Sequence, residues 1–240
     1  YVMEMANSGE YGKIYGAVQG ISSLLASVGG MISGLLYQFK EGEYALYICS
    51  FLLIASTLWA AIGLKNNQCM HGERLPILQI FKSINKRILI FCVLVFIQSF
   101  VAGPMWSFII PMYCYNVLLF SPAKLGILMS MDELIGAPTY MLAGRVVDKV
   151  NVVKFNILFL LITALGGLFL IKSPTPTIFM VVFLICSVSI SCTFVGIPKE
   201  RIGFIRKEQK GFELALISVC GSLGDSLGNN VLGRVAEKEQ

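Results

Sequence analysis

Charged residues are scarce in this sequence. Lys, Arg, Asp and Glu make up 14% of the 240 residues, and hydrophobic residues make up 56%. A soluble domain carries about 25% charged residues, so the composition excludes an ordinary soluble domain. Histidine occurs once, as His71, without a second metal ligand at a useful spacing. The seven cysteines form no Cys-x-x-Cys pair, so they indicate neither a disulfide framework nor a metal centre.

Patterns of catalytic residues are also missing. No nucleophile lies beside a base in a recognisable motif, so we expect neither an enzyme nor catalytic residues, and no cofactor. The net charge of +5 is modest and does not call for a nucleic-acid partner. The chain begins at Tyr1 without a signal-peptide pattern, and we expect it to be a fragment of something longer.

Long apolar runs make up most of the sequence. In lipid every backbone polar group must be bonded within the protein, so runs of about 20 apolar residues are predicted to be helices. The sequence therefore predicts an all-α integral membrane protein embedded in the lipid bilayer, with about seven transmembrane helices. These predicted spans are residues 13–37, 44–64, 88–118, 124–143, 153–171, 177–197 and 212–234.

The basic residues gather on one side of the predicted spans. Of the 19 lysines and arginines, 14 fall in connections on one side and 5 on the other. The positive-inside rule makes the first side cytoplasmic, which places the start of the chain in the cytoplasm. The basic segment 199–210 is on this side and is predicted to be a solvated turn.

The longest interruption lies between the second and third spans. Residues 77–85 of this segment alternate apolar and polar side chains at helical spacing, as a surface helix does. We predict a division into the end of one bundle at 1–64, a cytoplasmic amphipathic linker at 65–87, and a second bundle at 88–240.

Glycines recur along the first and last spans. Small residues three or four positions apart let two membrane helices pack backbone to backbone, so Gly16, Gly29 and Gly34 are predicted to be packing residues. With a constant offset of 199 residues, Gly29 and Gly34 match Gly228 and Gly233. We interpret the two spans as corresponding members of two parallel repeats.

Polar residues in the spans give candidates for a substrate cavity. Gln98 and Trp106 lie in a span broken by prolines, and a cavity and a purely structural role are equally favoured for them. Ser187 and Ser191 share a helical face, although helical serines often bond back to their own carbonyls. Asn229 lies in a polar stripe of the last span.

Three acids fall well inside the predicted spans. Asp132 and Glu133 lie in the fourth span, and Asp225 in the seventh stands where the first repeat has Ala26. Each costs about 2.5–3.5 kcal/mol at the centre of a membrane helix. Structural hydrogen bonds to neighbouring helices are one explanation, most plausible for Asp132. We favour a role in coupling transport to protons or sodium, with Asp225 first and Glu133 next.

One loop between two spans carries a recognisable spacing. Residues 142–154 read LAGRVVDKVNVVK, in which Gly144 and Arg145 precede Asp148 and Lys149. An acid at a helix–loop junction can pair with a base or receive the positive end of another helix. The spacing resembles the loop signature of the major facilitator superfamily, Gly-x-x-x-Asp-Arg, with Lys149 in place of the arginine. The glycines of the first span also resemble the family's glycine-rich antiporter motif.

The resemblance covers almost the whole chain, from the family's fifth helix to its eleventh. It implies an incomplete helical bundle of two repeats and transport of a small solute by alternating access, and we expect the protein in the plasma membrane. A non-transporting receptor or a lipid-handling protein on the same scaffold is the alternative, because a fold does not fix a function.

The predicted orientation can be tested at Cys69, the one cysteine predicted to lie in a loop. An impermeant thiol reagent should leave Cys69 unmodified in intact cells and label it once the membrane is opened. Labelling of Cys69 in intact cells would reverse the orientation that the basic residues predict.

Overall fold

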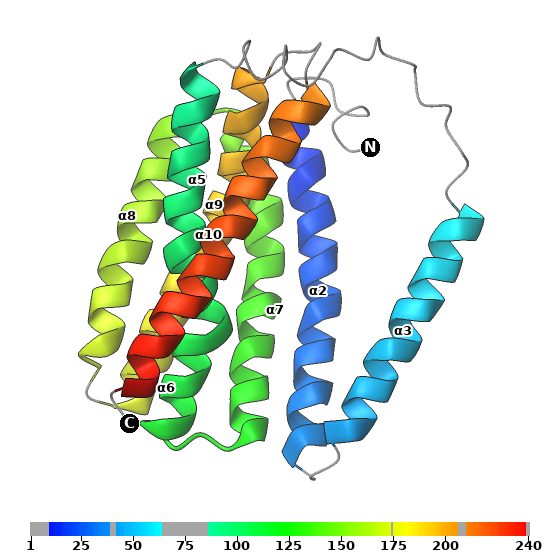
Figure 1. The fold of residues 1–240 in the computed structure, drawn as a ribbon, viewed down its shortest axis with the longest axis vertical. Helices are drawn as coiled ribbons and strands as arrows, with labels where there is room; N and C mark the ends of the chain where they lie inside the picture. Colours follow the sequence, from blue (N-terminus) through cyan, green and yellow to red (C-terminus); the bar gives the residue numbers. More distant parts are fainter. Residues whose placement is uncertain (1–9, 39–41, 64–85, 174, 206–209, 239–240) are drawn as a thin grey trace. The chain divides into compact units, whose positions relative to one another are not determined.

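Helices make up most of the part of the chain that the structure, a computed structural model, describes. The described residues are 10–38, 42–63, 86–173, 175–205 and 210–238. The elements are α2 (Tyr11–Gln38), α3 (Gly42–Gly63), α5 (Lys86–Pro104), η1 (Met105–Ile109), α6 (Ile110–Asn116), α7 (Pro122–Val147), α8 (Val152–Ile171), α9 (Pro176–Phe204) and α10 (Lys210–Lys238) (Figure 1). Since α5, η1 and α6 follow one another without a break, the described residues form one long helix for each predicted span. The all-α prediction is confirmed.

Four of the described helices are long and apolar enough to cross a membrane, judged by length and composition. They are α2, the continuous helix from Lys86 to Asn116, α8 and α9. Helices α7 and α10, with 26 and 29 residues, are also long enough, because about 20 helical residues span the hydrocarbon layer. Their charged residues lower their mean hydropathy.

The predicted linker lies almost entirely outside the described residues. Only Lys86 and Arg87 of the predicted segment 65–87 are described, and they begin α5. The predicted division into two bundles at this segment stays a prediction.

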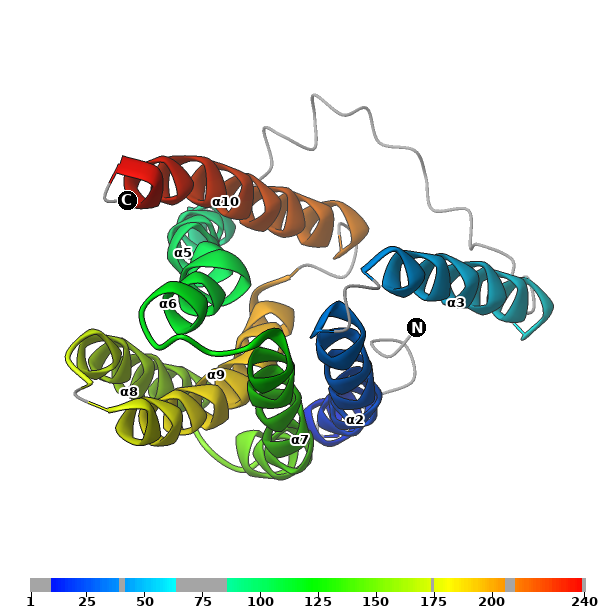
Figure 2. The ribbon, with the colours of Figure 1, turned by 90° about the horizontal axis from the view of Figure 1, so that it is seen from below.

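One compact unit of the chain contains α2, α7, α8 and α9. Helices α2 and α7 lie side by side in both views (Figures 1 and 2). They run antiparallel, because Gly12 near the start of α2 faces Gly144 near the end of α7, and Gly34 faces Gly126 at the opposite ends. We call this contact the α2–α7 seam.

Glycines set how closely the two helices of this seam approach. A Cβ atom added to Gly34 would lie 2.7 Å from the Cα of Gly126, and one added to Gly20 would lie 2.8 Å from the carbonyl oxygen of Ala137. A real Cβ does not approach backbone atoms this closely. The helices therefore touch through their backbones, as small residues at membrane helix contacts permit.

Helix α9 completes the packing around one end of α7. Val147 and Val195 are fully buried there, in a cluster with Ala143 and Cys192. Aromatic side chains of α8 and α2 pack against this cluster. The cluster fixes the end of α7 from which Asp148 projects.

The second compact unit contains α3, the helix formed by α5 and η1, and α10. Helix α10 crosses α5 obliquely (Figures 1 and 2). The two run parallel, since Ser99 faces Gly221 and Gly103 faces Asp225 one turn further along. Ser107 and Asn229 continue this register by another turn.

A proline makes this second contact possible. Pro104 has no backbone N–H, so the carbonyl oxygen of Phe100 lacks its usual helical donor. Gly228 of α10 lies directly over that oxygen, and its missing side chain leaves the room. Immediately after Pro104 the chain widens into the π-helical turn η1, where the N–H of Ile110 donates to the carbonyl of Met105. Such turns are rare and occur frequently at functional sites.

The predicted packing glycines divide into two groups. Gly16 and Gly34 lie in the α2–α7 seam, and Gly228 lies in the contact between α10 and α5. A Cβ added to Gly29 or Gly233 would meet no atom within 4 Å among the described residues. Those two glycines therefore make no close helix contact in the described part of the chain.

Gly34 and Gly29 form a matched pair for testing the seam, since both lie in α2. Gly34→Ala should lower the free energy of unfolding by about 1–3 kcal/mol because the methyl group overpacks against Gly126. Gly29→Ala should leave stability unchanged or raise it by up to about 1 kcal/mol through helix propensity. The melting temperatures of the full-length proteins in detergent give the comparison. Equal stability of the two variants would contradict backbone contact at the seam.

Candidate functional site

Asp148 lies where α7 ends and where α2 begins. Its carboxylate accepts hydrogen bonds from the backbone N–H groups of Gly12 at 3.1 Å and Lys13 at 2.9 Å. The first N–H groups of a helix have no partner within the helix, and the helix dipole favours an anion there. Asp148 thus caps α2 from a distant part of the chain. Receiving the positive end of another helix is one of the two roles that the sequence left open for this acid.

A lysine from a third helix completes this arrangement. The ammonium group of Lys199 on α9 forms a salt bridge with the Asp148 carboxylate and donates to the carbonyl oxygen of Val147 at 3.1 Å. The side chains of Lys199 and Asp148 are only 19% and 10% exposed. Partial burial reduces the screening by water that weakens exposed ion pairs. We call Asp148, Lys199 and the first turn of α2 the Asp148 node.

The prediction that residues 199–210 form a solvated turn is wrong for its first part. Helix α9 continues to Phe204, and Lys199 points back from it to the Asp148 node. Of the other signature residues, Gly144 lies against Gly12 and permits the approach of α2. Arg145 and Lys149 are exposed, so the base paired with Asp148 in the structure is Lys199.

Glu133 lies in the middle of the α2–α7 seam. The hydroxyl of Ser23 on α2 donates to the Glu133 carboxylate and lies 2.9 Å from its backbone carbonyl. Ser23 is 4% exposed, so this contact is enclosed between the helices. A hydroxyl hydrogen bond lowers the cost of a carboxyl group in an apolar setting but leaves its charge unbalanced.

Asp132 faces a different helix from its neighbour. The hydroxyl of Ser187 on α9 lies 3.4 Å from the Asp132 carbonyl and interacts with its carboxylate. One turn along α7, Gly136 leaves room for two hydroxyl groups and an aromatic ring. A Cβ there would meet the hydroxyls of Ser23 at 3.2 Å and Ser191 at 3.3 Å, and the ring of Tyr140 at 3.3 Å. Polar groups of α2, α7 and α9 thus converge beside the two acids.

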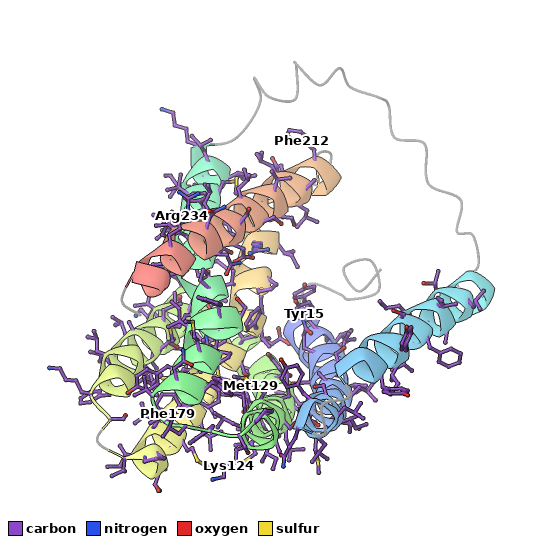
Figure 3. The ribbon with its side chains drawn as sticks, turned by 60° about the horizontal axis from the view of Figure 1, so that its bottom comes forward. Tyr15, Lys124, Met129, Phe179, Phe212 and Arg234 are labelled. Atoms are coloured by element: carbon purple, nitrogen blue, oxygen red, sulfur yellow. The ribbon has the colours of Figure 1, made fainter. Side chains whose placement is uncertain are left out.

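Asp225 belongs to α10, the helix that carries the labelled residues Phe212 and Arg234 in Figure 3. Its carboxylate rests against the Cα of Gly103 on α5. Among the described residues it has no hydrogen bond and no ion pair. This distinguishes Asp225 from Glu133 and Asp132, each of which meets a serine.

The remaining cavity candidates differ in their surroundings. Ser187 and Ser191 are buried between α7 and α9, at 2% and 4% exposure. Gln98 and Trp106 are half-buried on α5 and η1, while Asn229 is exposed on α10. Asn229 lies beside Ser107, whose hydroxyl is 3.4 Å from its amide oxygen. A shared substrate cavity for these five residues stays a prediction.

Several residues of these contacts were not identified from the sequence. Ser23 is not among the residues that the sequence analysis predicts for a site, although a serine and an acid on two helices with packing glycines could have indicated the pair. Nothing local identifies Lys199 within its basic segment. Glu213 is completely buried in the first turn of α10.

These contacts define a class of protein before any comparison is made. The helices are apolar and long enough to cross a membrane, and carboxyl groups lie within them beside hydroxyls and glycines. Acids in membrane helices are rare and mark ion or substrate pathways by default. The chain is therefore a multi-pass membrane protein with carboxyl and hydroxyl groups between its helices, as in proteins that conduct ions or solutes.

Comparison with known proteins identifies the family. The family model described as Major Facilitator Superfamily matches residues 1–229. The chain therefore belongs to the major facilitator superfamily, and its general function is transport across a membrane. No curated protein and no solved structure matches the chain.

The Asp148 node predicts a difference between two lysines. Lys199→Met should lower the free energy of unfolding by about 1–3 kcal/mol, because it leaves a partly buried carboxylate without its charged partner. Lys149→Met, which removes an exposed lysine next to Asp148, should change stability by less than about 0.5 kcal/mol. Thermal unfolding of the full-length protein in detergent measures both. If the two variants are equally stable, the salt bridge does not stabilise the fold.

Proposed function

We propose that the protein is a secondary transporter that moves a small solute by alternating access and draws on a proton or sodium gradient. The family supports membrane transport in general. The observation that carries the coupling proposal is Asp225, a carboxyl group in a membrane helix without a hydrogen bond or ion pair among the described residues. Such a group is stable in lipid only when a proton or a cation neutralises it.

Asp225 is the first candidate for ion coupling because its surroundings leave it available. A carboxylate already bonded within the protein loses those bonds when it takes up an ion. Asp225 rests on the bare backbone of Gly103 and loses nothing of this kind. Its neighbour Asn229 adds a polar group one turn along the same face.

Glu133 is the second candidate, in a different role. Its bond to Ser23 crosses the α2–α7 seam, so a change in its charge alters the contact between two helices directly. Asp132 is the third candidate. Its contacts with Ser187 fit a packing role better than a coupling role.

The Asp148 node provides a contact that alternating access requires. Exchange between two states needs interactions that are made in one state and broken in the other. Asp148 joins the start of α2, the end of α7 and Lys199 of α9 through hydrogen bonds and one salt bridge. With the start of the chain in the cytoplasm of a plasma-membrane protein, this node lies at the cytoplasmic ends of these helices. We propose that it holds these ends together in one of the two states.

A small solute is the proposed substrate, and Gln98, Trp106, Ser187, Ser191 and Asn229 are the proposed contacts. These side chains offer amide, indole and hydroxyl groups, and none carries a charge. The alternative function is a non-transporting receptor or a lipid-handling protein on the same scaffold. Acids within the helices favour transport, because a receptor has no need of a titratable group in lipid.

Asp225→Asn tests the coupling role while it keeps the shape of the side chain. The full-length variant in sealed vesicles should still bind the solute, but gradient-driven accumulation should fall to the level of passive equilibration. Asp132→Asn is the matched control, and it should retain accumulation because Asp132 acts in packing.

Two results would contradict this proposal. Accumulation by Asp225→Asn at the wild-type level, with unchanged dependence on pH and sodium, would assign coupling to another residue. Binding of a solute by the wild-type protein without any movement across the membrane would favour the receptor.

A further inference from the structure

Oxygen-bearing residues of two helices face one another in the turns that contain Asp225 and Asn229. Gly103 and Ser107 lie one helical turn apart on the helix formed by α5 and η1, and Asp225 and Asn229 lie one turn apart on α10. The parallel register places Gly103 against Asp225 and Ser107 against Asn229. The two residues of α10 thus face the two residues of the other helix. They contribute the Asp225 carboxylate, the Asn229 amide oxygen, the Ser107 hydroxyl and the Gly103 carbonyl.

The side-chain donors of these two pairs are the hydroxyl of Ser107 and the NH2 group of Asn229, and no bond from either of them to Asp225 is present in the structure. The single hydroxyl proton of Ser107 is used in the 2.8 Å bond to the carbonyl oxygen of Gly103. The amide oxygen of Asn229 lies 3.4 Å from the same hydroxyl, which exceeds the usual length of about 2.5–3.0 Å for an O–H···O bond. The Asp225 carboxylate has no donor among the described residues. A cation bound among these oxygens would give the Asp225 carboxylate the partner that it lacks in the described part of the chain.

The 3.4 Å separation fits the coordination shell of a hard cation. Ca²⁺ holds its oxygen ligands at about 2.4 Å, so two ligands at right angles are about 3.4 Å apart. Na⁺ has nearly the same ionic radius as Ca²⁺. One carboxylate balances one positive charge, so a monovalent cation leaves no net charge in the membrane interior, whereas a divalent cation leaves one.

The π-helical turn contributes to the same place. Ser107 lies within η1, and Gly103 and Pro104 directly precede it. A widened turn interrupts the regular ladder of backbone bonds, so Ser107 lies at an irregular point of its helix. Hydroxyl, carbonyl and carboxylate oxygens are the donors that hard cations prefer.

We propose that Asp225, Asn229, Ser107 and the Gly103 carbonyl form a binding site for Na⁺. The site rests on the proposed function in one respect: it identifies sodium as the coupling ion. A proton needs only the carboxylate, so Ser107 and Asn229 distinguish the two ions. Binding and release of Na⁺ at this site would change the contact between α5 and α10, and the sodium gradient would drive that change.

The test measures Na⁺ binding directly on the purified full-length protein without solute. Binding of radioactive ²²Na⁺ and the rise in melting temperature are recorded as NaCl replaces choline chloride. Wild type should bind Na⁺ and become more stable. Asp225→Asn should lose both effects, and Ser107→Ala and Asn229→Leu should each weaken Na⁺ affinity about tenfold or more.

Asn230→Leu is the matched control, because Asn230 is the exposed neighbour of Asn229 and projects away from it by about 100°. It should bind Na⁺ like wild type, which separates loss of a ligand from a general effect of leucine on α10. Monodisperse elution of each variant establishes that it is folded. Ser107→Ala is the mildest change and keeps the test decisive if Asp225→Asn fails to fold.

Two outcomes would overturn the sodium site. Wild-type Na⁺ affinity in Ser107→Ala would exclude the four-oxygen arrangement. Stabilisation by acid alone, with no response to Na⁺, would make Asp225 a proton carrier. Since binding is measured without transport, Na⁺ binding by a protein that does not accumulate solute would overturn the transporter and leave the site standing. Sodium-independent accumulation without Na⁺ binding would overturn the sodium site and leave the transporter standing.

Discussion

The backbone contact between α2 and α7 is the constraint on which the polar interactions of its unit depend. Glycine at Gly12, Gly34 and their partners brings the two helix axes close enough for short side chains to bridge them. Ser23 reaches Glu133 only at that distance, and the Asp148 carboxylate reaches the first N–H groups of α2 for the same reason. Close packing and polar contact in this unit therefore have a single geometric origin.

The acids of this chain are accommodated by groups of very different strength. Asp148, at a helix end, has backbone donors and a lysine. Glu133 has a serine hydroxyl, and Asp225 rests against a glycine. The free energy needed to ionise a carboxyl group in an apolar setting rises as its partners weaken. The series thus runs from an acid with several donors to an acid with no hydrogen-bond partner among the described residues.

Much of the fold could be predicted from the sequence because lipid imposes a simple rule. Length and hydropathy located each long helix of the described residues, and seam glycines such as Gly16 and Gly34 followed from their spacing. Pairings between helices were harder, since Lys199 and Asp148 are distant in sequence and neither carries a signal that selects the other. The role of Ser107 depends on a register between α5 and α10 that spacing within one helix cannot reveal.

The turn at Met105–Ile109 changes how the whole of the 86–116 helix presents its side chains. A π-helical turn accommodates one residue more than an α-helical turn, which rotates everything beyond it by about 100° relative to an unbroken helix. A helical wheel drawn through this segment therefore assigns the wrong direction to the residues of α6. Tyr113 and its neighbours therefore point in a different direction from the one obtained by extending the apolar pattern of α5. The segments before and after the turn can each present their own face.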